Sequence, residues 1–331
     1  MGKLRGAIAG CGFFGNIQIE AWRRMPDVDL IAACDPALER AQAAAARAYT
    51  DAAAMLDRER PDFLDIATRP DTHLALVRLA AERGIPAIVQ KPLAETMEQG
   101  RELADFVEAS GVPVMVHENW RWQPWYREVK RRMEGGDIGQ PLTYTFRIRQ
   151  RDGLGDNPYP NQPYFRQMPR LLLYETLIHP IDTARFLFGD IARLQAFAKR
   201  HNPSIAGEDR AVVLLEHANT ADGVIDGSRY TNAEPAGPAM GDSIFEGTEG
   251  VLRVLANGEV YRGATLLTRH DTSTGYKGDS VFATQRHFID CLRARAPFET
   301  GVREYLGSFA AVEGAYRSIA EGRVISLRQA D

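Results

Sequence analysis

Residues 4–15 read LRGAIAGCGFFG, and this stretch decides the fold of the first part of the chain. An apolar run leads into the pattern Gly10-x-Gly12-x-x-Gly15, and apolar side chains then recur at helical spacing from Ile17 to Trp22. A strand, a glycine-rich turn and a helix in this order are typical of a dinucleotide-binding site. The N–H groups and the dipole at the start of such a helix attract phosphate charge.

Each glycine of the turn has a separate expected role. Gly10 allows the tight turn, Gly12 lets the backbone approach a pyrophosphate, and Gly15 lets the helix pack closely on the strand. A second apolar run, residues 28–34, ends in Asp35, 20 residues after Gly15, where a carboxylate would bind the ribose hydroxyls. This context favours a dinucleotide site over the alternative, a purely structural glycine turn.

Length and composition indicate a globular protein of two domains. The chain has 331 residues, of which 44% are hydrophobic and 25% charged, and we place the domains at residues 1–122 and 123–331. A formal net charge of −4 argues against nucleic acid or an anionic membrane as a partner. The three cysteines have neither metal-ligand nor disulfide spacing, and the first strand leaves no room for a signal peptide. We therefore expect a cytoplasmic protein with no metal site.

Alternating strands and helices over the first 120 residues predict a doubly wound parallel sheet. After the apolar run that begins at Leu4 and the helical pattern from Ile17 to Trp22, the expected strands are residues 28–34, 62–67, 85–89 and 112–116, and the expected helices are residues 38–49, 51–57, 73–83 and 97–109. Ligands of such sheets lie beyond the carboxyl ends of the strands. That rule selects Asp35, Thr68, Lys91 and the segment 117–119.

The later part of the chain predicts an α/β domain with a large, mostly antiparallel open sheet. Strand-like runs cover residues 142–150, 192–199, 211–217, 224–230, 242–246, 251–255, 264–268 and 324–327. One helix is expected to run through Met133 and to end at the glycines 135 and 136, and others are expected at 171–182, 282–294 and 302–321. Residues 151–170 form a long irregular stretch of the kind that is usually functional or mobile. The cluster Trp120, Trp122, Trp125 and Tyr126 is more typical of a domain-junction core than of a binding platform.

Two groups of side chains can carry chemistry. Lys91 follows an apolar strand directly and precedes Pro92, so its ammonium would enter the cleft of a bound nicotinamide; a solvated surface lysine is the alternative. On a helix, Glu175, His179 and Asp182 would share one face. An imidazole there can take the proton of an alcohol that loses hydride, while a buried structural histidine is the alternative. Pro180 predicts that this helix is kinked or begins beside His179.

These motifs together resemble the Gfo/Idh/MocA oxidoreductases, relatives of glucose–fructose oxidoreductase and inositol dehydrogenase, over nearly the whole chain. The resemblance rests on the glycine turn with Asp35, on residues 68–73, 90–92, 119–121, 175–182 and 247–250, and on the final helix pair. It implies an N-terminal Rossmann domain that binds NAD and a C-terminal substrate and oligomerisation domain.

The resemblance also implies the site. Lys91 would contact the reacting hydroxyl, His179 would accept its proton and Glu175 would assist His179. The residues expected to bind the cofactor are Gly10, Gly12, Phe13, Phe14, Gly15, Asp35, Thr68, Arg69, His73, Gln90, Lys91 and Asn119. Those expected to bind substrate are Lys91, Asn119, Trp120, Arg121, Phe165, Arg166, Arg170, Glu175 and His179.

Three departures from the family pattern bear on the substrate. Glu175 replaces the usual aspartate, Gln90 replaces the usual glutamate before the lysine, and residues 169–171 replace the glycines that begin the catalytic helix. Within the family, residues 170–182 are most similar to the D-apiose dehydrogenases.

We predict an NAD-dependent dehydrogenase that oxidises a neutral sugar, an aldose to a lactone, and that forms a dimer or tetramer. Arg166 and Arg170 leave an acidic substrate open as an alternative. Two other classes of protein also stay open: a relative that retains NAD and hydrolyses glycosides or eliminates groups by transient oxidation, and a non-catalytic nucleotide sensor.

Overall fold

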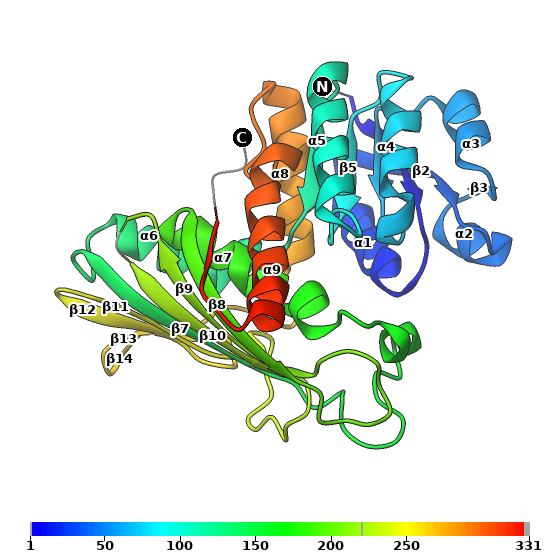
Figure 1. Ribbon diagram of the computed structural model, residues 1–331. Helices are drawn as coiled ribbons and strands as arrows, with labels where there is room; N and C mark the ends of the chain where they lie inside the picture. Colours follow the sequence, from blue (N-terminus) through cyan, green and yellow to red (C-terminus); the bar gives the residue numbers. More distant parts are fainter. Residues whose placement is uncertain (1, 220, 328–331) are drawn as a thin grey trace. The chain divides into compact units, whose positions relative to one another are not determined.

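The computed structural model of the chain describes residues 2–219 and 221–327 (Figure 1). Contacts divide these residues into two compact units. The first unit contains residues up to 119 together with residues 280–306, and the second contains residues 120–279 and those from 307 onward. The predicted domains were two consecutive segments of the chain. The first unit instead also includes a stretch from near the end of the chain.

The first unit contains a six-stranded parallel sheet in the order β3-β2-β1-β4-β5-β6. Its strands are β1 (Leu4–Ala9), β2 (Val28–Cys34), β3 (Arg47–Tyr49), β4 (Phe63–Ile66), β5 (Ala87–Gln90) and β6 (Val114–His117). Its helices are α1 (Phe13–Arg24), α2 (Leu38–Ala44), α3 (Ala52–Glu59), α4 (His73–Ala81), α5 (Met97–Ser110), α8 (Ser280–Ala294) and the short η1 (Pro70–Thr72). α1 packs with α8, and α4 packs with α3 and α5. The predicted doubly wound parallel sheet is confirmed.

The expected helix over residues 38–49 is wrong in its second half. α2 ends at Ala44, and Arg47–Tyr49 form the edge strand β3, which pairs with Ala32–Cys34 of β2. Alanine favours a helix, but this preference is worth less than about 1 kcal/mol per residue, and pairing with an open sheet edge overrides it. The Tyr49 carbonyl accepts the Asp35 N–H at 3.1 Å, so β3 also fixes the end of β2.

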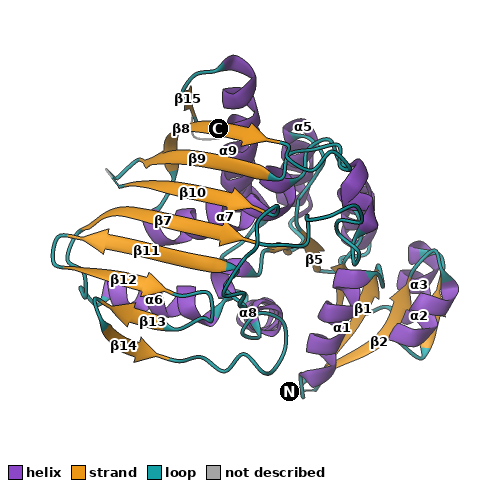
Figure 2. Cartoon of the chain, turned by 90° about the horizontal axis from the view of Figure 1, so that it is seen from below, coloured by secondary structure: helices purple, strands orange, loops and turns teal. Residues whose placement is uncertain are grey.

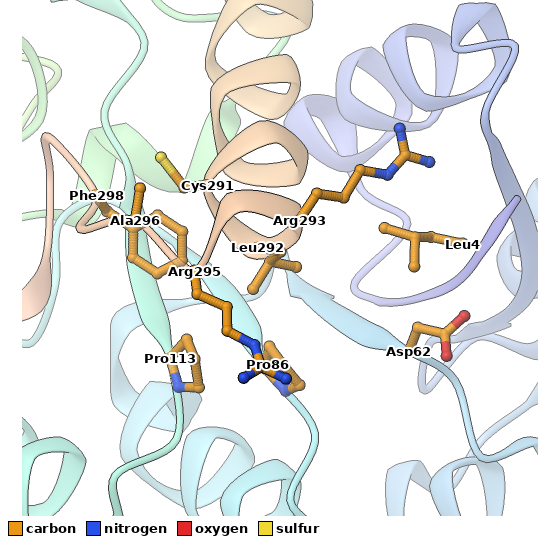
Figure 3. Close-up of a pocket in the computed structure, with 10 residues that line it drawn as sticks. All are labelled: Leu4, Asp62, Pro86, Pro113, Cys291, Leu292, Arg293, Arg295, Ala296 and Phe298. Atoms are coloured by element: carbon orange, nitrogen blue, oxygen red, sulfur yellow. The ribbon is translucent and has the colours of Figure 1, made fainter. Parts of the chain in front are cut away.

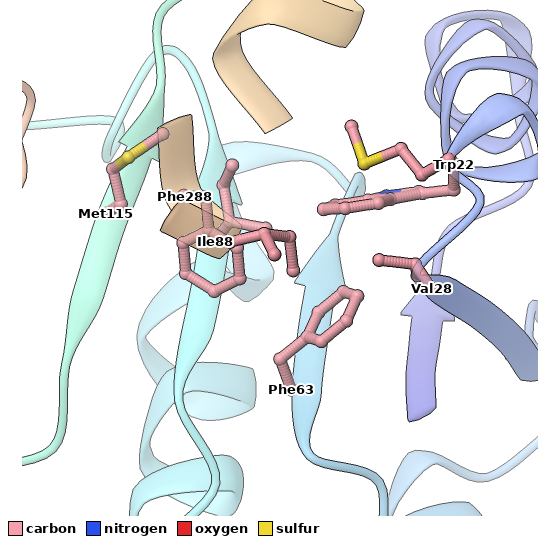
Figure 4. Packing of buried hydrophobic residues seen from close by; sticks show 8 residues of the cluster. Trp22, Val28, Phe63, Ile88, Met115 and Phe288 are labelled. Carbon is pink, nitrogen blue, oxygen red and sulfur yellow. The ribbon is translucent and has the colours of Figure 1, made fainter. Parts of the chain in front are cut away.

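A buried apolar cluster explains why residues 280–306 belong to the first unit. Phe288 and Ile289 of α8 pack with Trp22, Phe63 and Ile88, alongside Met25, Val28 and Met115 (Figure 4). The Phe63 ring lies edge-on to the Phe288 ring, with 5.6 Å between centroids. Burying a large apolar side chain contributes about 1.5–3 kcal/mol, so α8 is a substantial part of this core.

The second unit contains a nine-stranded sheet in the order β14-β13-β12-β11-β7-β10-β9-β8-β15. Its strands are β7 (Pro141–Arg149), β8 (Ile191–Lys199), β9 (Arg210–His217), β10 (Asp222–Ser228), β11 (Gly241–Gly247), β12 (Gly250–Val254), β13 (Val260–Arg262), β14 (Thr265–Thr268) and β15 (Ile325–Ser326). Pairing is antiparallel except between β7 and β10. The mostly antiparallel sheet is confirmed, and β13 is a strand that the sequence did not predict.

One face of this sheet is apolar and covered. Tyr144, Phe146 and Ile148 of β7 are buried, while Thr145 and Arg147 point to the other side. Figure 2 shows the strands in front of the helices α6 (Pro124–Glu134) and α7 (Ile178–Phe188). The remaining helical elements are η2 (Trp120–Trp122), η3 (Pro163–Gln167), the π-helix η4 (Leu172–Leu177) and α9 (Val302–Glu321), which crosses the boundary between the units.

The irregular segment 150–171 is anchored. Asn202 Nδ2 donates to the carbonyls of Gly153 at 2.7 Å and Gly155 at 2.9 Å, and Tyr159 packs in an apolar cluster with Phe165 and Leu171. Within the described residues, no helix is both long and apolar enough to cross a membrane.

Candidate active site

The turn after β1 has the geometry that the three glycines predict. Gly10 adopts φ = +96°, and a Cβ there would lie 2.6 Å from the Ala67 carbonyl oxygen. A Cβ on Gly15 would lie 2.3 Å from the carbonyl oxygen of Gly10, so only glycine allows this approach of α1 to β1. A Cβ on Gly12 would meet nothing within 4 Å. The backbone at Gly12 therefore faces open space at the N-terminus of α1, as a phosphate site requires.

Asp35 closes the other side of this turn. Its carboxylate accepts the Cys11 N–H at 2.8 Å and the Ala37 N–H at 2.9 Å, and the residue is 6% exposed. Phe13 is about half exposed, and the Phe14 ring lies edge-on to His117, 6.2 Å between centroids. The open backbone at Gly12 and the fixed carboxylate together fit a dinucleotide with free ribose hydroxyls.

The loop after β4 is tied to the loop after β5. Thr72 Oγ1 donates to Thr68 Oγ1 at 2.6 Å, and the His73 ring spans the carbonyls of Leu93 and Thr68 at 3.0 and 3.2 Å. Burial lowers the pKa of His73. α4 begins at His73, as expected, and the ring fixes backbone on both sides. Arg69 is largely exposed and pairs with Asp71 at 3.2 Å.

The strand ends β5 and β6 carry the remaining predicted residues of the first unit. The Lys91 N–H donates to Gln90 Oε1 at 2.8 Å, and the Lys91–Pro92 peptide is cis. Asn119 is buried and its Nδ2 donates to Ser280 Oγ at 2.9 Å. Glu118, also buried, accepts the Tyr305 hydroxyl at 3.1 Å. Residues 117–119 thus connect β6 to α8 and to the first turn of α9.

Two consecutive helical segments present the predicted catalytic residues of the second unit. Glu175 lies in the π-helix η4, and α7 begins at Ile178, which confirms the expectation from Pro180. Glu208 caps the start of η4: its Oε1 accepts the Leu173 N–H at 3.0 Å and the Tyr316 hydroxyl at 2.6 Å.

His179 is held by η2. Its ring stacks on the Trp120 ring with centroids 5.0 Å apart and planes at 3°, and the residue is 8% exposed. Arg121 reaches the same helix and pairs with Asp182 at 2.8 Å through Nε and 2.7 Å through Nη2. Ser308 Oγ also donates to Asp182, at 2.8 Å. Trp120 and Arg121 therefore position one helix face through two adjacent contacts.

Asp182 and Arg121 form a buried ion pair that stabilises the structure. Both are buried, and each binds the other through two hydrogen bonds. Asp182 shares a helix face with His179, as predicted, but its carboxylate is directed to Arg121 and Ser308. Breaking such a buried pair would leave an uncompensated charge.

Arg166 and Arg170 also have partners within the second unit. The Arg166 guanidinium donates to Asn157 Oδ1 and, at 2.8 Å, to the Pro158 carbonyl. The Arg170 guanidinium binds Glu313 and lies over the Tyr316 ring, 4.2 Å from its centroid. Phe165 is buried, with its ring edge-on to Tyr159.

Sequence reasoning missed Arg229, which follows β10 and lies next to η4. It donates to Thr176 Oγ1 at 3.1 Å and to Asp152 at 3.1 Å through Nε, and its guanidinium lies 4.7 Å from the Tyr159 ring centroid. Burial lowers the pKa of Arg229, but the hydrogen bond and charge of Asp152, together with Tyr159 and Glu175, outweigh burial and raise the pKa above its ordinary value. Lys277 lies in the same electrostatic cluster: burial and Arg229 lower the pKa of its ammonium to about 7. The sequence signal that could have identified Arg229 is its position near the end of the predicted strand 224–230.

A cavity of about 550 Å³ in the first unit lies elsewhere (Figure 3). It is lined by Leu4, Asp62, Pro86 and Pro113, which lie at the amino ends of β1, β4, β5 and β6. The other lining residues lie in the last turn of α8 and just after it: Cys291, Leu292, Arg293, Arg295, Ala296 and Phe298. The predicted site residues lie at the carboxyl ends, where parallel sheets bind ligands, and none of them lines this cavity.

The described residues contain no group of three or more His, Cys, Asp or Glu side chains that could hold a metal ion. The cysteines Cys11, Cys34 and Cys291 are buried and unpaired with each other. Burial raises the pKa of the Cys11 thiol to about 12, so this residue at the glycine turn is an inert packing group.

Comparison with known proteins gives the family. Residues 4–118 match the model described as an oxidoreductase family with an NAD-binding Rossmann fold, and residues 126–253 match the GFO/IDH/MocA C-terminal domain. The chain is similar to the D-apiose dehydrogenases of Paraburkholderia graminis, at 38% identity covering 98% of this chain and 90% of the relative, and of Rhizobium rhizogenes, at 37% identity covering 99% and 98%.

Among solved structures, an oxidoreductase from Agrobacterium radiobacter in complex with NAD+, L-tartaric acid and magnesium is 34% identical, with a TM-score of 0.91 and 98% of both chains covered. A levoglucosan dehydrogenase in complex with NADH and L-sorbose has a TM-score of 0.89 at 20% identity, covers 99% of this chain and 100% of its own, and shares the fold. The chain belongs to the Gfo/Idh/MocA family of NAD-binding oxidoreductases.

Proposed function

We propose that this protein is an NAD-dependent dehydrogenase that oxidises a neutral sugar at a carbinol carbon, an aldose to its lactone. The single observation that carries the chemistry is the fixed orientation of His179, which is nearly buried and stacked flat on Trp120. An imidazole held in this way suits one proton transfer at one position.

NAD+, when bound, accepts the hydride from the carbinol carbon. Gly10, Gly12 and Gly15 would accommodate its pyrophosphate, and Asp35 its ribose hydroxyls. Phe13, Phe14, Thr68, Arg69, His73, Gln90 and Asn119 complete the proposed cofactor-binding residues. Pro36 and Ala37, which follow Asp35 directly, offer no arginine for a 2′-phosphate.

The side chains of the protein divide the remaining work. His179 takes the hydroxyl proton as the C–H bond breaks. The alcohol is thereby converted to a carbonyl, with its hydride going to NAD+ and its proton to His179. Lys91 stabilises the oxygen as negative charge develops on it. Glu175 tunes His179, and Arg121 and Asp182 position its helix.

A neutral substrate is supported by the two arginines that could have read a carboxylate. Arg166 and Arg170 are each engaged with side chains or carbonyls of their own unit. The two D-apiose dehydrogenase relatives, similar over nearly the full chain, also favour a neutral branched pentose. An acid is the competing substrate, because the related structure from Agrobacterium radiobacter contains L-tartaric acid.

The test compares D-apiose, unbranched aldoses and polyols with aldonic and uronic acids at matched concentration, with NAD+ in excess. We expect stoichiometric NADH with aldoses, and D-apiose above the unbranched sugars. Turnover of the acids alone would contradict the neutral-sugar proposal. Product without net NADH would instead indicate the relatives that retain the cofactor, and NAD binding without turnover of any compound would indicate a sensor.

A homo-oligomer, dimer or tetramer, and a cytoplasmic location complete the proposal. Phe197, Leu214 and Ile244 are 59%, 41% and 37% exposed on the side of the nine-stranded sheet opposite to Tyr144 and Phe146. Apolar side chains gathered on one sheet face are typical of an interface between subunits. The mass in solution, measured by light scattering, tests this, and a monomer at micromolar concentration would contradict it.

A further inference from the structure

A chain of buried hydrogen bonds runs through the first unit from Asp65 to the backbone of Lys91. Gln18 Nε2 donates to Asp65 Oδ1 at 2.9 Å and to Oδ2 at 3.1 Å. Gln90 Nε2 donates to Gln18 Oε1 at 3.2 Å, and Gln90 Oε1 accepts the Lys91 N–H at 2.8 Å. Asp65 and Gln18 are fully buried and Gln90 is 6% exposed. We call these three side chains the amide relay.

The two ends of the relay dictate its polarity. An ionised carboxylate only accepts, so whenever Asp65 is ionised Gln18 has to present its NH2 to Asp65 and its oxygen to Gln90. A backbone N–H only donates, so Gln90 has to present its oxygen to Lys91 and its NH2 to Gln18. The two requirements agree at the Gln18–Gln90 junction, and every group that the relay uses is matched.

We propose that Asp65 is a positioning residue: it sets the polarity of the amide relay and thereby fixes the backbone of Lys91. The inference rests on the proposed function, in which Lys91 stabilises the reacting oxygen. It adds to that function a residue on β4 that need not touch substrate or cofactor.

The cost of burying Asp65 supports a role beyond packing. Its partners in the described part of the first unit are neutral donors, the Gln18 amide and the Trp22 indole, the latter at 2.6 Å. A buried carboxylate held only by neutral donors is expensive compared with an apolar side chain. Position 90 is glutamine and carries no charge. The carboxylate of the relay is therefore that of Asp65, which the Gln18 and Gln90 side chains connect to the Lys91 backbone.

Changing one end of the relay breaks its polarity at one junction. In Asp65→Asn, with its oxygen kept on Trp22, the new NH2 lies 2.9 Å from the Gln18 NH2, donor against donor, and the Gln18 NH2 keeps only its longer contact, 3.1 Å, to the oxygen that Trp22 also uses. If Gln18 and Gln90 turn over to relieve this contact, the Gln90 NH2 meets the Lys91 N–H instead. In Gln90→Glu, Gln18 faces an acceptor on both sides and can match only one with its NH2.

The double variant, Asp65→Asn with Gln90→Glu, restores every match. Gln18 turns over in it: its oxygen accepts from the new amide at position 65, and its NH2 donates to the new carboxylate at position 90. That carboxylate also accepts the Lys91 N–H. The relay therefore predicts that the second substitution repairs the damage of the first, which independent structural effects do not do.

The experiment measures Tm, NAD+ affinity, kcat and KM for Asp65→Asn, Gln90→Glu and the double variant at about pH 8, where Asp65 is mostly ionised. We expect each single variant to lose roughly 3–8 °C in Tm for one buried mismatch. We expect kcat to fall roughly tenfold with sugar KM little changed, because a misplaced Lys91 acts on the transition state. The double variant should be more stable and faster than either single variant.

Trp22→Phe is the matched control. It removes a donor from the same carboxylate but leaves the relay polarity intact, so it should lower Tm with kcat within about twofold of wild type. A fall in kcat as large as in Asp65→Asn would assign the effect to general loss of packing and overturn the proposal.

Additive losses of Tm in the double variant would also overturn the proposal, whatever the activities. Repair of Tm with kcat unaltered in all three variants would uphold the relay and count against the proposed role of Lys91, and so against the proposed function.

If Asp65→Asn and the double variant do not fold, the stability of Gln90→Glu decides. The relay requires it to be less stable than wild type at alkaline pH and to recover as protonation of one carboxyl removes the mismatch, and equal stability throughout would overturn the proposal.

Discussion

The proposed role of His179 as the acceptor of one particular proton requires its ring to be held in one orientation, and single contacts achieve this. Trp120 fixes the plane of its ring, and the Thr183 hydroxyl donates to its carbonyl at 3.0 Å. Glu175 lies in η4, close in sequence to the ring that it is proposed to tune. Histidine and glutamate therefore differ in their expected effect on the rate.

We predict that His179→Ala lowers kcat by roughly 100- to 10,000-fold, the usual contribution of a general base. Glu175→Gln keeps the shape and some hydrogen bonding, so its loss should be clearly smaller. Steady-state kinetics with the preferred sugar measure both. Equal damage in the two variants would mean that the base is wrongly assigned.

Asp35 predicts a preference for NAD over NADP. Its carboxylate is fixed by two backbone N–H groups, so it cannot turn away from a 2′-phosphate. One negative charge against another should cost about 1–3 kcal/mol, or roughly ten- to a hundredfold in kcat/KM. Comparable kcat/KM values for the two cofactors would contradict this role.

Asp65 predicts how stability depends on pH. Burial raises the pKa of this carboxyl from 3.8 to about 7, although hydrogen bonds from Trp22 and Gln18 lower it. The folded protein thus binds the proton more tightly than the unfolded chain, so this contribution to stability is complete below the unfolded pKa and is lost as pH rises toward 7. From pH 5 to pH 8, wild type should lose roughly 2–3 kcal/mol more unfolding free energy than Asp65→Asn. Urea titrations measure the difference, and parallel pH profiles would contradict it.

At the scale of elements, the second unit places its catalytic segment by contacts on both ends. Glu208 caps the start of η4, and η2 holds α7 through Trp120 and Arg121. These contacts join positions far apart in the sequence. The local pattern of residues 171–182 therefore predicted a helix that is kinked or begins beside His179, but not the contacts that hold it.

We predict that Arg121→Met destabilises the protein by about 3–5 kcal/mol, because it leaves the Asp182 charge buried without its partner. Arg121→Met with Asp182→Leu should recover part of that loss, since a buried pair is replaceable by apolar groups. Chemical denaturation measures both variants. A stability loss below about 1 kcal/mol for the single variant would show that the pair is not needed to hold α7.

At the scale of the whole molecule, the sequence predicted what is encoded locally. The glycine turn, Asp35 and the alternation in β7 each follow from short-range rules, and the structure agrees with all three. Short-range rules could not predict the edge strand β3, because its pairing with β2 overrides the helix propensity of alanine. They also could not predict that α8 belongs to the first unit. The amide relay was hidden for the same reason, because Gln18, Asp65 and Gln90 meet only in the folded sheet.

The proposed function assigns the cofactor and Lys91 to the first unit and His179 to the second. The proposed reaction, oxidation of a neutral sugar by NAD+, is tested most directly by measuring NADH formed per sugar consumed with D-apiose and a panel of aldoses. We predict one NADH for each sugar oxidised, with a lactone or its hydrolysis product recovered, and no such turnover in His179→Ala. Consumption of the sugar without net NADH, or NADH formation only with sugar acids, would contradict it.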